Sequence, residues 1–226
     1  MSTFKIAIDG PAGAGKSTIA KRAAKELKFV YIDTGAMYRA IGLAAIRAGV
    51  DPNGDIAAVE ALLETVKIDI AHSEAGQQVF LNGEDVSTEI RLPEVSVAAS
   101  DVSKIPAVRS KLLDLQRSIA EKTDVIMDGR DIGTVILPDA DVKIFMSADE
   151  VSRAKRRYKE LIAKGEDVKY EDVLREMIER DNNDRNRDVA PAVPASDAVM
   201  MDNSNMSVEE NIDAVIDLIR SKGIEI

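Results

Sequence analysis

One glycine-rich segment constrains the fold of this chain more than any other feature. Residues 10–17 read GPAGAGKS, which matches the pattern G-x-x-x-x-G-K-[ST]. The segment follows an apolar run at residues 4–8 and precedes residues 17–27, where apolar residues recur at spacings of three and four. Strand, glycine-rich loop and helix in this order predict a phosphate-binding loop at the amino end of the helix.

The residues of this loop have separable expected roles. Its backbone N–H groups and the positive end of the following helix suit phosphate oxygens. We expect Lys16 to reach the β- and γ-phosphates of ATP and the Ser17 hydroxyl to ligate Mg²⁺. Asp128, which follows the apolar run at 124–127, is a second candidate for Mg²⁺, although a turn-forming aspartate is an alternative interpretation. The predicted ATP-binding residues are Gly10, Pro11, Ala12, Gly13, Ala14, Gly15, Lys16, Ser17 and Thr18.

Apolar runs along the chain predict an α/β fold: a P-loop, doubly wound, parallel five-stranded sheet with a small antiparallel β insert and a short helical lid. S-x-x-E patterns at residues 147–150 and 207–210 predict helices that begin with capping boxes. The five expected strands are residues 4–8, 29–32, 124–127, 142–146 and 198–201.

One region departs from this alternation of strands and helices. Residues 66–70 and 78–81 are two apolar runs separated by a turn that contains Gly76, and Asn82-Gly83 is a strong hairpin signal. We therefore expect a single domain over 1–226, with a core at 1–62 and 94–226, an insert at about 63–93 and a lid at about 150–170. His72, the only histidine, is interpreted as a solvated turn residue without a catalytic role.

Composition limits the compartment and the partners. The 226 residues include no cysteine, which fits a reducing compartment, and we expect a cytoplasmic protein. No apolar stretch reaches the roughly 20 residues of a membrane span. A formal net charge of −10 argues against broad binding to nucleic acid or to acidic membranes.

Missing motifs and arginine-rich segments together distinguish between the classes of P-loop protein. The chain lacks the N-K-x-D element of guanine-nucleotide switches and has no tryptophan, which argues against a nucleic-acid motor. A small-molecule kinase remains, and it needs arginines that neutralise transferring phosphates. Residues 153–159 (RAKRRYK) suit such a lid, although a solvated helix face would look the same. Arg180, Asp184 and Arg187 would lie on one helix face if the helix continues. Ordinary salt bridges within a helix use the same spacing, so a binding site and a structural role are both open.

Several motifs in a fixed order resemble those of bacterial cytidylate kinases, within the nucleoside monophosphate kinase group. The resemblance covers nearly the whole chain. Its motifs are IDGPAGAGKST (8–18), DTGAMYR (33–39), NGEDVSTEIR (82–91), DGRDIGT (128–134) and ERDNNDRNRDVAPAVPASDA (179–198).

The resemblance implies transfer of the γ-phosphate of ATP to CMP or dCMP, with Mg²⁺, by a monomer whose insert enlarges the acceptor lobe. Ser100, Arg109 and Asp131 would recognise cytosine, and Arg39 would hold the acceptor phosphate. Alternatives are a kinase for another acceptor such as UMP, and a protein that binds ATP without transfer. The implied catalytic residues are Lys16, Arg153, Arg157 and Arg187. The implied CMP-binding residues are Asp33, Thr34, Tyr38, Arg39, Ser100, Arg109, Arg130, Asp131, Arg180, Asp184 and Arg187.

Overall fold

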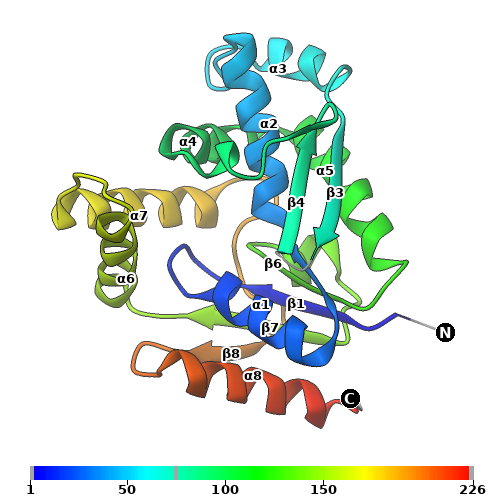
Figure 1. The fold of residues 1–226 in the computed structure, drawn as a ribbon, viewed down its shortest axis with the longest axis vertical. Helices are drawn as coiled ribbons and strands as arrows, with labels where there is room; N and C mark the ends of the chain where they lie inside the picture. Colours follow the sequence, from blue (N-terminus) through cyan, green and yellow to red (C-terminus); the bar gives the residue numbers. More distant parts are fainter. Residues whose placement is uncertain (1–2, 74–75, 224–226) are drawn as a thin grey trace. The chain divides into compact units, whose positions relative to one another are not determined.

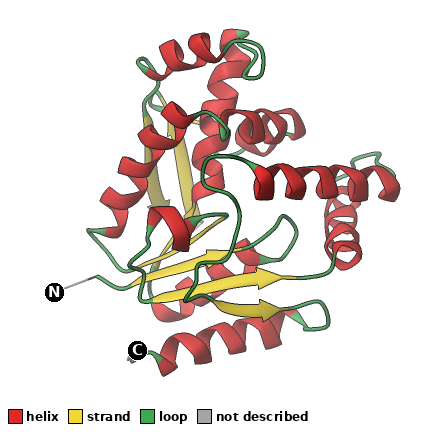
Figure 2. Cartoon of the chain, turned by 180° about the vertical axis from the view of Figure 1, so that it is seen from behind, coloured by secondary structure: helices red, strands yellow, loops and turns green. Residues whose placement is uncertain are grey.

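The computed structural model describes residues 3–73 and 76–223 of the chain (Figure 1). The chain divides into two compact units, one formed by Met1–Phe29 with Asp124–Ile226 and the other by Val30–Thr123. Figure 2 shows which segments are helices and which are strands. Among the described residues, no helix is both long and apolar enough to cross a membrane.

The first unit combines parallel strands with helices that follow them. Its elements are β1 (Lys5–Asp9), α1 (Lys16–Leu27), β6 (Val125–Gly129), the π-helix η2 (Ile132–Ile136), β7 (Val142–Ser147), α6 (Glu150–Ala163), α7 (Tyr170–Asn186), β8 (Val199–Asp202) and α8 (Val208–Ser221).

The main sheet has five strands in the order β2-β6-β1-β7-β8, where β2 is Val30–Asp33. This confirms the predicted α/β fold with a five-stranded parallel sheet. Strand β1 pairs in parallel with both β6 and β7, and Ile8 and Asp9 stand opposite Asp128 and Gly129 of β6. Asp9, the last residue of β1, and Asp128, one residue before the end of β6, therefore lie on adjacent strands at the carboxyl ends where the phosphate loop begins.

Buried apolar faces and caps explain where the helices of this unit lie. The face of α1 predicted from its spacing is buried, and α1 contacts α8. The predicted capping box at Ser207 and Glu210 is confirmed at the start of α8. The capping box predicted at Ser147 is wrong, because Ser147 ends β7 and Asp149 caps α6 by accepting a hydrogen bond from Ser152 N.

The second unit contains strand β2, five helices and a small antiparallel sheet. The elements after β2 are α2 (Thr34–Ala48), α3 (Ile56–Leu63), β3 (Ile68–Ser73), β4 (Gly76–Leu81), β5 (Glu84–Asp85), the 3₁₀-helix η1 (Glu89–Arg91), α4 (Pro93–Val102) and α5 (Pro106–Ala120). The antiparallel sheet has the order β3-β4-β5 and falls inside the predicted insert range 63–93.

The turns of the antiparallel sheet follow the sequence signals in part. Asn82 and Gly83 have φ of 50° and 87°, as a two-residue hairpin turn between β4 and β5 requires. Gly76, expected in a turn, begins β4, and residues 74–75 lie outside the described residues. His72, expected in a turn, belongs to β3. The boundaries of the insert and the lid as functional parts stay predictions.

Candidate active site

The phosphate loop joins β1 to α1 in a conformation that only glycine tolerates at two points. Gly10 has φ of 144°, and a Cβ there would lie 2.0 Å from the Met146 carbonyl oxygen. Gly15 has φ of 84° and caps α1, with no side chain bonded to the first N–H groups of the helix. These N–H groups lie at the positive end of the helix dipole, which favours a phosphate.

Lys16, the first residue of α1, is buried inside this loop. Its Nζ donates a hydrogen bond to the Pro11 carbonyl oxygen at 2.8 Å. Burial, together with the positive charge of Arg130, lowers its pKa to about 7, although Asp128 and Asp9 act in the opposite direction. A nucleotide phosphate placed beside Nζ would favour the charged ammonium.

Ser17 and Asp128 meet at the edge of the sheet. The Ser17 hydroxyl donates to Asp128 Oδ2 at 2.6 Å, and Asp128 is 4% exposed. A hydroxyl and a carboxylate side by side are oxygen ligands of the kind that Mg²⁺ prefers, and Mg²⁺ is commonly held by one or two protein groups together with phosphates and water. The donor set therefore fits the predicted metal.

Arg153, predicted in the lid, is buried against the phosphate loop. Its guanidinium donates to the carbonyl oxygens of Ala148 at 2.9 Å and Ala12 at 3.0 Å, and to the Asp181 carboxylate. Asp181 also accepts from Ala12 N at 3.4 Å. Arg153 and Asp181 thus bind the backbone carbonyl oxygen and the backbone N–H of Ala12, respectively. Asp181 was missed from the sequence, although it lies within the motif at 179–198.

The other lid arginines lie differently. Arg156, not among the predicted site residues, donates to the side-chain and backbone oxygens of Asn203 at 3.0 and 2.8 Å. Asn203, 1% exposed, donates through Nδ2 to the Ala14 carbonyl oxygen at 2.7 Å. Arg157 is partly exposed and pairs with Glu160 at 2.9 Å. Asn203 was also missed, and its only sequence signal is its position just after strand β8.

Three arginines and two aspartates of the first unit form a second cluster. Arg130 Nε donates to Asp184 Oδ2 at 3.0 Å, and Arg187 lies 3.5 Å from Asp131 and 3.9 Å from Asp184. Burial would raise the pKa of Asp184, but Arg130, Arg180 and Arg187 together hold it below its ordinary value. The cluster is buried, carries a net positive charge, and suits an anion.

Helix α7 ends before the last member of this cluster. Arg187 follows the helix with φ of −66° and ψ of 142°, and its Nε donates to the Ala190 carbonyl oxygen at 2.6 Å. The condition for a shared helix face, a helix that continues through Arg187, is therefore not met. The three residues 180, 184 and 187 are nevertheless coupled, because the chain turns back directly after the helix.

Asp9 is a buried acid that is not among the site residues predicted from the sequence. Its two oxygens accept hydrogen bonds from Ile132 N and Gly133 N, both at 2.8 Å. Burial, together with the negative charge of Asp131, raises its pKa to about 6 despite these bonds. Asp9 therefore fixes the start of η2 directly after Asp131. A polar residue that closes an apolar strand before a glycine was the available signal.

In the second unit, Asp33 and Arg39 lie together at the start of α2. Asp33 caps α2 by accepting from Ala36 N at 3.0 Å, and its Oδ2 lies 3.0 Å from Arg91 and 4.0 Å from Arg39. Burial would raise the pKa of Asp33, but Arg39 and Arg91 hold it below its ordinary value. Arg91 ends η1 and was not among the predicted site residues.

The remaining predicted residues of this unit lie on three helices. Thr34 is buried at the start of α2. The Arg109 guanidinium of α5 stacks over the Tyr38 ring of α2 at 5.6 Å, a cation–π distance. Ser100 lies in α4, and its carbonyl oxygen accepts from the Ser103 hydroxyl at 2.7 Å. The structure thus pairs Arg109 with Tyr38.

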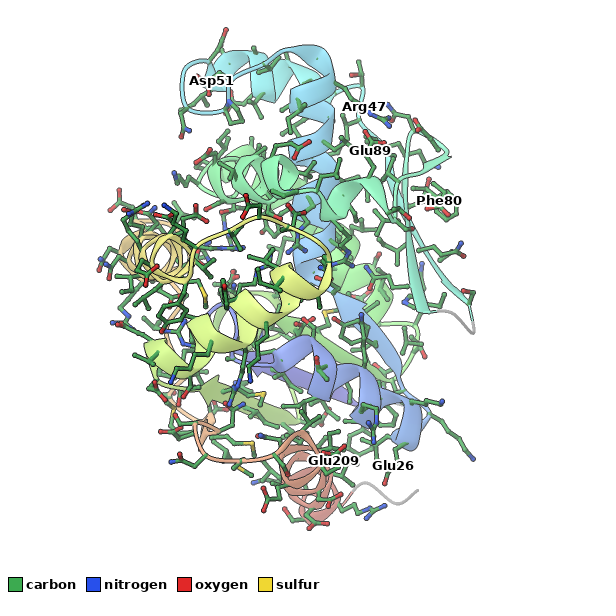
Figure 3. The ribbon with its side chains drawn as sticks, turned by 60° about the vertical axis from the view of Figure 1, so that its left-hand side comes forward. Glu26, Arg47, Asp51, Phe80, Glu89 and Glu209 are labelled. Atoms are coloured by element: carbon green, nitrogen blue, oxygen red, sulfur yellow. The ribbon has the colours of Figure 1, made fainter. Side chains whose placement is uncertain are left out.

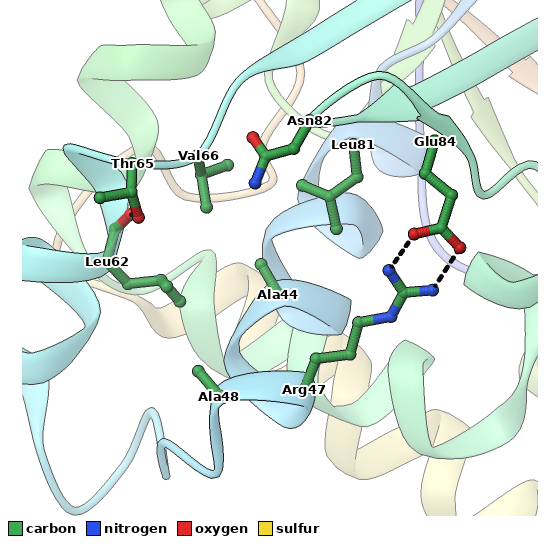
Figure 4. Close-up of a pocket in the computed structure, with 9 residues that line it drawn as sticks. All are labelled: Ala44, Arg47, Ala48, Leu62, Thr65, Val66, Leu81, Asn82 and Glu84. Carbon is green, nitrogen blue, oxygen red and sulfur yellow. Dashed lines mark hydrogen bonds and ion pairs between the residues drawn. The ribbon is translucent and has the colours of Figure 1, made fainter.

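A separate hollow of about 330 Å³ lies at the other end of α2 (Figure 4). Ala44, Ala48 and Leu81 supply apolar walls, and Arg47 and Glu84 form an ion pair at its margin. None of the predicted site residues lines it.

Comparisons with known proteins agree over nearly the full chain. A family model described as cytidylate kinase matches residues 6–221. A protein named cytidylate kinase from Caldanaerobacter subterraneus subsp. tengcongensis is 51% identical over 218 residues, covering 96% of this chain and 95% of that protein. One of the same name from Caldicellulosiruptor bescii is 50% identical over 218 residues, covering 96% of each. A solved structure of an uncharacterized protein from Eubacterium ventriosum shares the fold, with a TM-score of 0.53, 15% identity and coverage of 97% and 99%.

Proposed function

Since the chain belongs to the cytidylate kinase family and is a nucleoside monophosphate kinase, we propose that it transfers the γ-phosphate of ATP to CMP and dCMP. The observation that carries this is the family match over residues 6–221. The arrangement of Lys16, Ser17 and Asp128 around the phosphate loop supports it, because phosphoryl transfer depends on alignment and charge neutralisation.

The donor side would be held by the first unit. The backbone N–H groups of residues 10 and 12–18 would bind the phosphates, and the Lys16 ammonium would lie against the β- and γ-oxygens. Ser17 and Asp128 would hold Mg²⁺, which supplies positive charge to the phosphates when bound. Arg153 and Arg157 would add charge from the lid. Arg153 reaches the loop already, whereas Arg157 would have to leave Glu160.

The acceptor would be bound by two groups of residues. The cluster of Arg130, Arg180 and Arg187 suits the acceptor phosphate. Asp184 would accept a hydrogen bond from a sugar hydroxyl of the acceptor. Asp131 would accept from the N4 amino group of cytosine, which uracil lacks.

In the second unit, Arg39 would hold the acceptor phosphate, and Thr34 and Tyr38 would border the acceptor. Ser100 and Arg109 would contact the base. A phosphate oxygen of CMP then attacks the γ-phosphorus in line, with no covalent enzyme intermediate. A trapped phosphoenzyme would contradict this mechanism.

The test is ADP release from ATP and Mg²⁺ with CMP, dCMP, UMP, AMP or GMP supplied one at a time. We expect turnover with CMP and dCMP. Turnover mainly with UMP or another acceptor would overturn the cytosine assignment, and ATP binding without ADP release would favour a protein that binds nucleotide only.

A variant sharpens this test. Asp131→Ala should reduce kcat/KM for CMP by about 10-fold to 100-fold, since one recognition hydrogen bond to a charged group contributes about 1.5–3 kcal/mol. Its KM for ATP should stay unchanged. Equal losses for CMP and UMP would contradict a role in base recognition.

We also propose that the protein is a cytoplasmic monomer, on the basis of its cysteine-free composition and the family resemblance. Sedimentation equilibrium of the full chain tests the monomer, since a dimer would double the mass of 24.5 kDa.

A further inference from the structure

Strand β2 carries the start of the acceptor-binding region, and its backbone is gripped by the antiparallel sheet. Gln77 of β4 pairs with the last residue of β2: its Oε1 accepts from Asp33 N at 2.8 Å, and its Nε2 donates to the Asp33 carbonyl oxygen at 3.3 Å. Nε2 of His72, opposite Gln77 in the β3–β4 register, lies 3.1 Å from the Tyr31 carbonyl oxygen. The side chains of Gln77 and His72 therefore pair with backbone hydrogen-bonding groups along one edge of β2.

The side chain of Asp33 connects this grip to Arg39. One carboxylate oxygen accepts from Ala36 N, and the other faces two guanidiniums. Arg91 donates a hydrogen bond to this second oxygen at 3.0 Å, whereas Arg39 lies 4.0 Å from it and forms only an ion pair. Gly35 leaves room for this arrangement, because a Cβ there would lie 3.2 Å from Asp33 Oδ1 and 3.5 Å from Arg39.

We propose that Gln77 and Arg91 are positioning residues for the acceptor phosphate, acting through Asp33 on Arg39. Gln77 fixes the backbone of Asp33, and Arg91 occupies the carboxylate oxygen that Arg39 would otherwise approach. Without either, Arg39 closes onto Asp33 and is drawn away from the acceptor. The inference rests on the proposed role of Arg39, and it gives the insert a defined task in acceptor binding.

The same sheet has a second attachment that provides a control. Arg47, near the carboxyl end of α2, forms a two-point pair with Glu84 at 2.7 and 2.9 Å and a further pair with Glu89 (Figures 3 and 4). This attachment holds β5 and η1 to α2 but has no described contact with Asp33. Because η1 also carries Arg91, the control breaks only the Glu84 half of this attachment: Glu84 lies on β5, and Arg47 keeps its pair with Glu89 of η1.

The experiment compares four variants by steady-state kinetics with CMP and ATP. Gln77→Leu and Arg91→Met should raise KM for CMP by about tenfold, which corresponds to about 1.4 kcal/mol and lies in the range of a lost hydrogen bond. KM for ATP and kcat should stay within about twofold. Gln78→Leu, which removes a neighbouring amide bonded to Asp85, and Glu84→Ala, which removes the partner of Arg47 on β5, should leave KM for CMP unchanged.

Three outcomes would overturn the inference. The first is that Gln77→Leu keeps the wild-type KM for CMP. An equal rise of KM for CMP in Glu84→Ala would mean that loosening of the insert, and not the placement of Arg39, matters. A parallel rise of KM for ATP would indicate a general defect.

Failure of the proposed function looks different from failure of this inference, because the wild-type protein itself would then show no CMP-dependent ADP release. If the wild type prefers another monophosphate, the same four variants are assayed with that acceptor, since Arg39 is assigned to the phosphate and not to the base.

Discussion

Replacing Asp9 by asparagine should change how the stability of the protein depends on pH. Asp9 is buried, and its pKa rises from 3.8 in the unfolded chain to about 6 in the folded protein. The folded state therefore binds more protons than the unfolded state between these values, so the free energy of unfolding falls as pH rises through this window. At 1.36 kcal/mol per pH unit, the whole fall attributable to Asp9 is about 3 kcal/mol.

The measurement is the difference in unfolding free energy between Asp9→Asn and wild type, from urea denaturation. About 2 kcal/mol of the fall lies between about pH 4.5 and about pH 7.5, from the linkage relation applied to these two pKa values. The substituted amide leaves one of the two N–H groups of η2 without its acceptor, which costs about 1–3 kcal/mol at every pH. The variant should therefore gain about 2 kcal/mol relative to wild type as pH rises across this range.

Subtracting the two curves cancels the titration of the groups that do not interact with Asp9, and the pH range below about 7.5 lies mostly below the pKa of its partner Lys16. Parallel curves for variant and wild type would refute the reasoning, whatever the constant offset. Asp85→Asn is a matched control of opposite sign, because the hydrogen bonds from Ser87 hold the pKa of Asp85 below its ordinary value. Its stability should fall relative to wild type as pH rises through the ordinary titration range of an aspartate.

Three further substitutions test the phosphate-loop region. Asp128→Asn should raise the Mg²⁺ concentration needed for half-maximal rate by about 10-fold to 100-fold, and an unchanged Mg²⁺ titration would remove Asp128 from the metal site. Asn203→Ala leaves the Ala14 carbonyl oxygen without its donor and removes one of the two Asn203 acceptors of Arg156, so urea denaturation should show a loss of about 2–3 kcal/mol and kinetics a higher KM for ATP; a stable variant with normal KM would contradict this. Asp181→Leu strands the buried Arg153 and should cost about 3–5 kcal/mol of stability, whereas a loss below about 1 kcal/mol would mean that Arg153 finds another partner.

Local patterns in the sequence determined the elements and the phosphate loop. The five strands, helix α1, the capping box of α8 and the Asn82-Gly83 turn all follow from periodicity or turn chemistry that acts within a few residues. The loop pattern with its flanking strand and helix led to Lys16 and Ser17 in the same way. Such signals are readable because the physical cause and the residues lie close together along the chain.

Contacts between distant residues were decided only by the tertiary structure. Asp9 reaches residues 132–133, Asp181 reaches residue 12, and Asn203 reaches residue 14, and no local pattern specifies which partner lies opposite. The cap of α6 was misassigned for a related reason: strand β7 continues through Ser147, so the helix begins later.

The same distinction applies to the acceptor region. The motif at 33–39 identified Asp33 and Arg39, but only the folded chain brings Gln77 and Arg91 to them from 44 and 58 residues away. A short motif records which side chains are available, whereas their charge state and orientation depend on neighbours that the fold supplies. The sequence by itself therefore determined the loop that binds phosphate, and the tertiary structure decided which residues hold the charged groups around it in place.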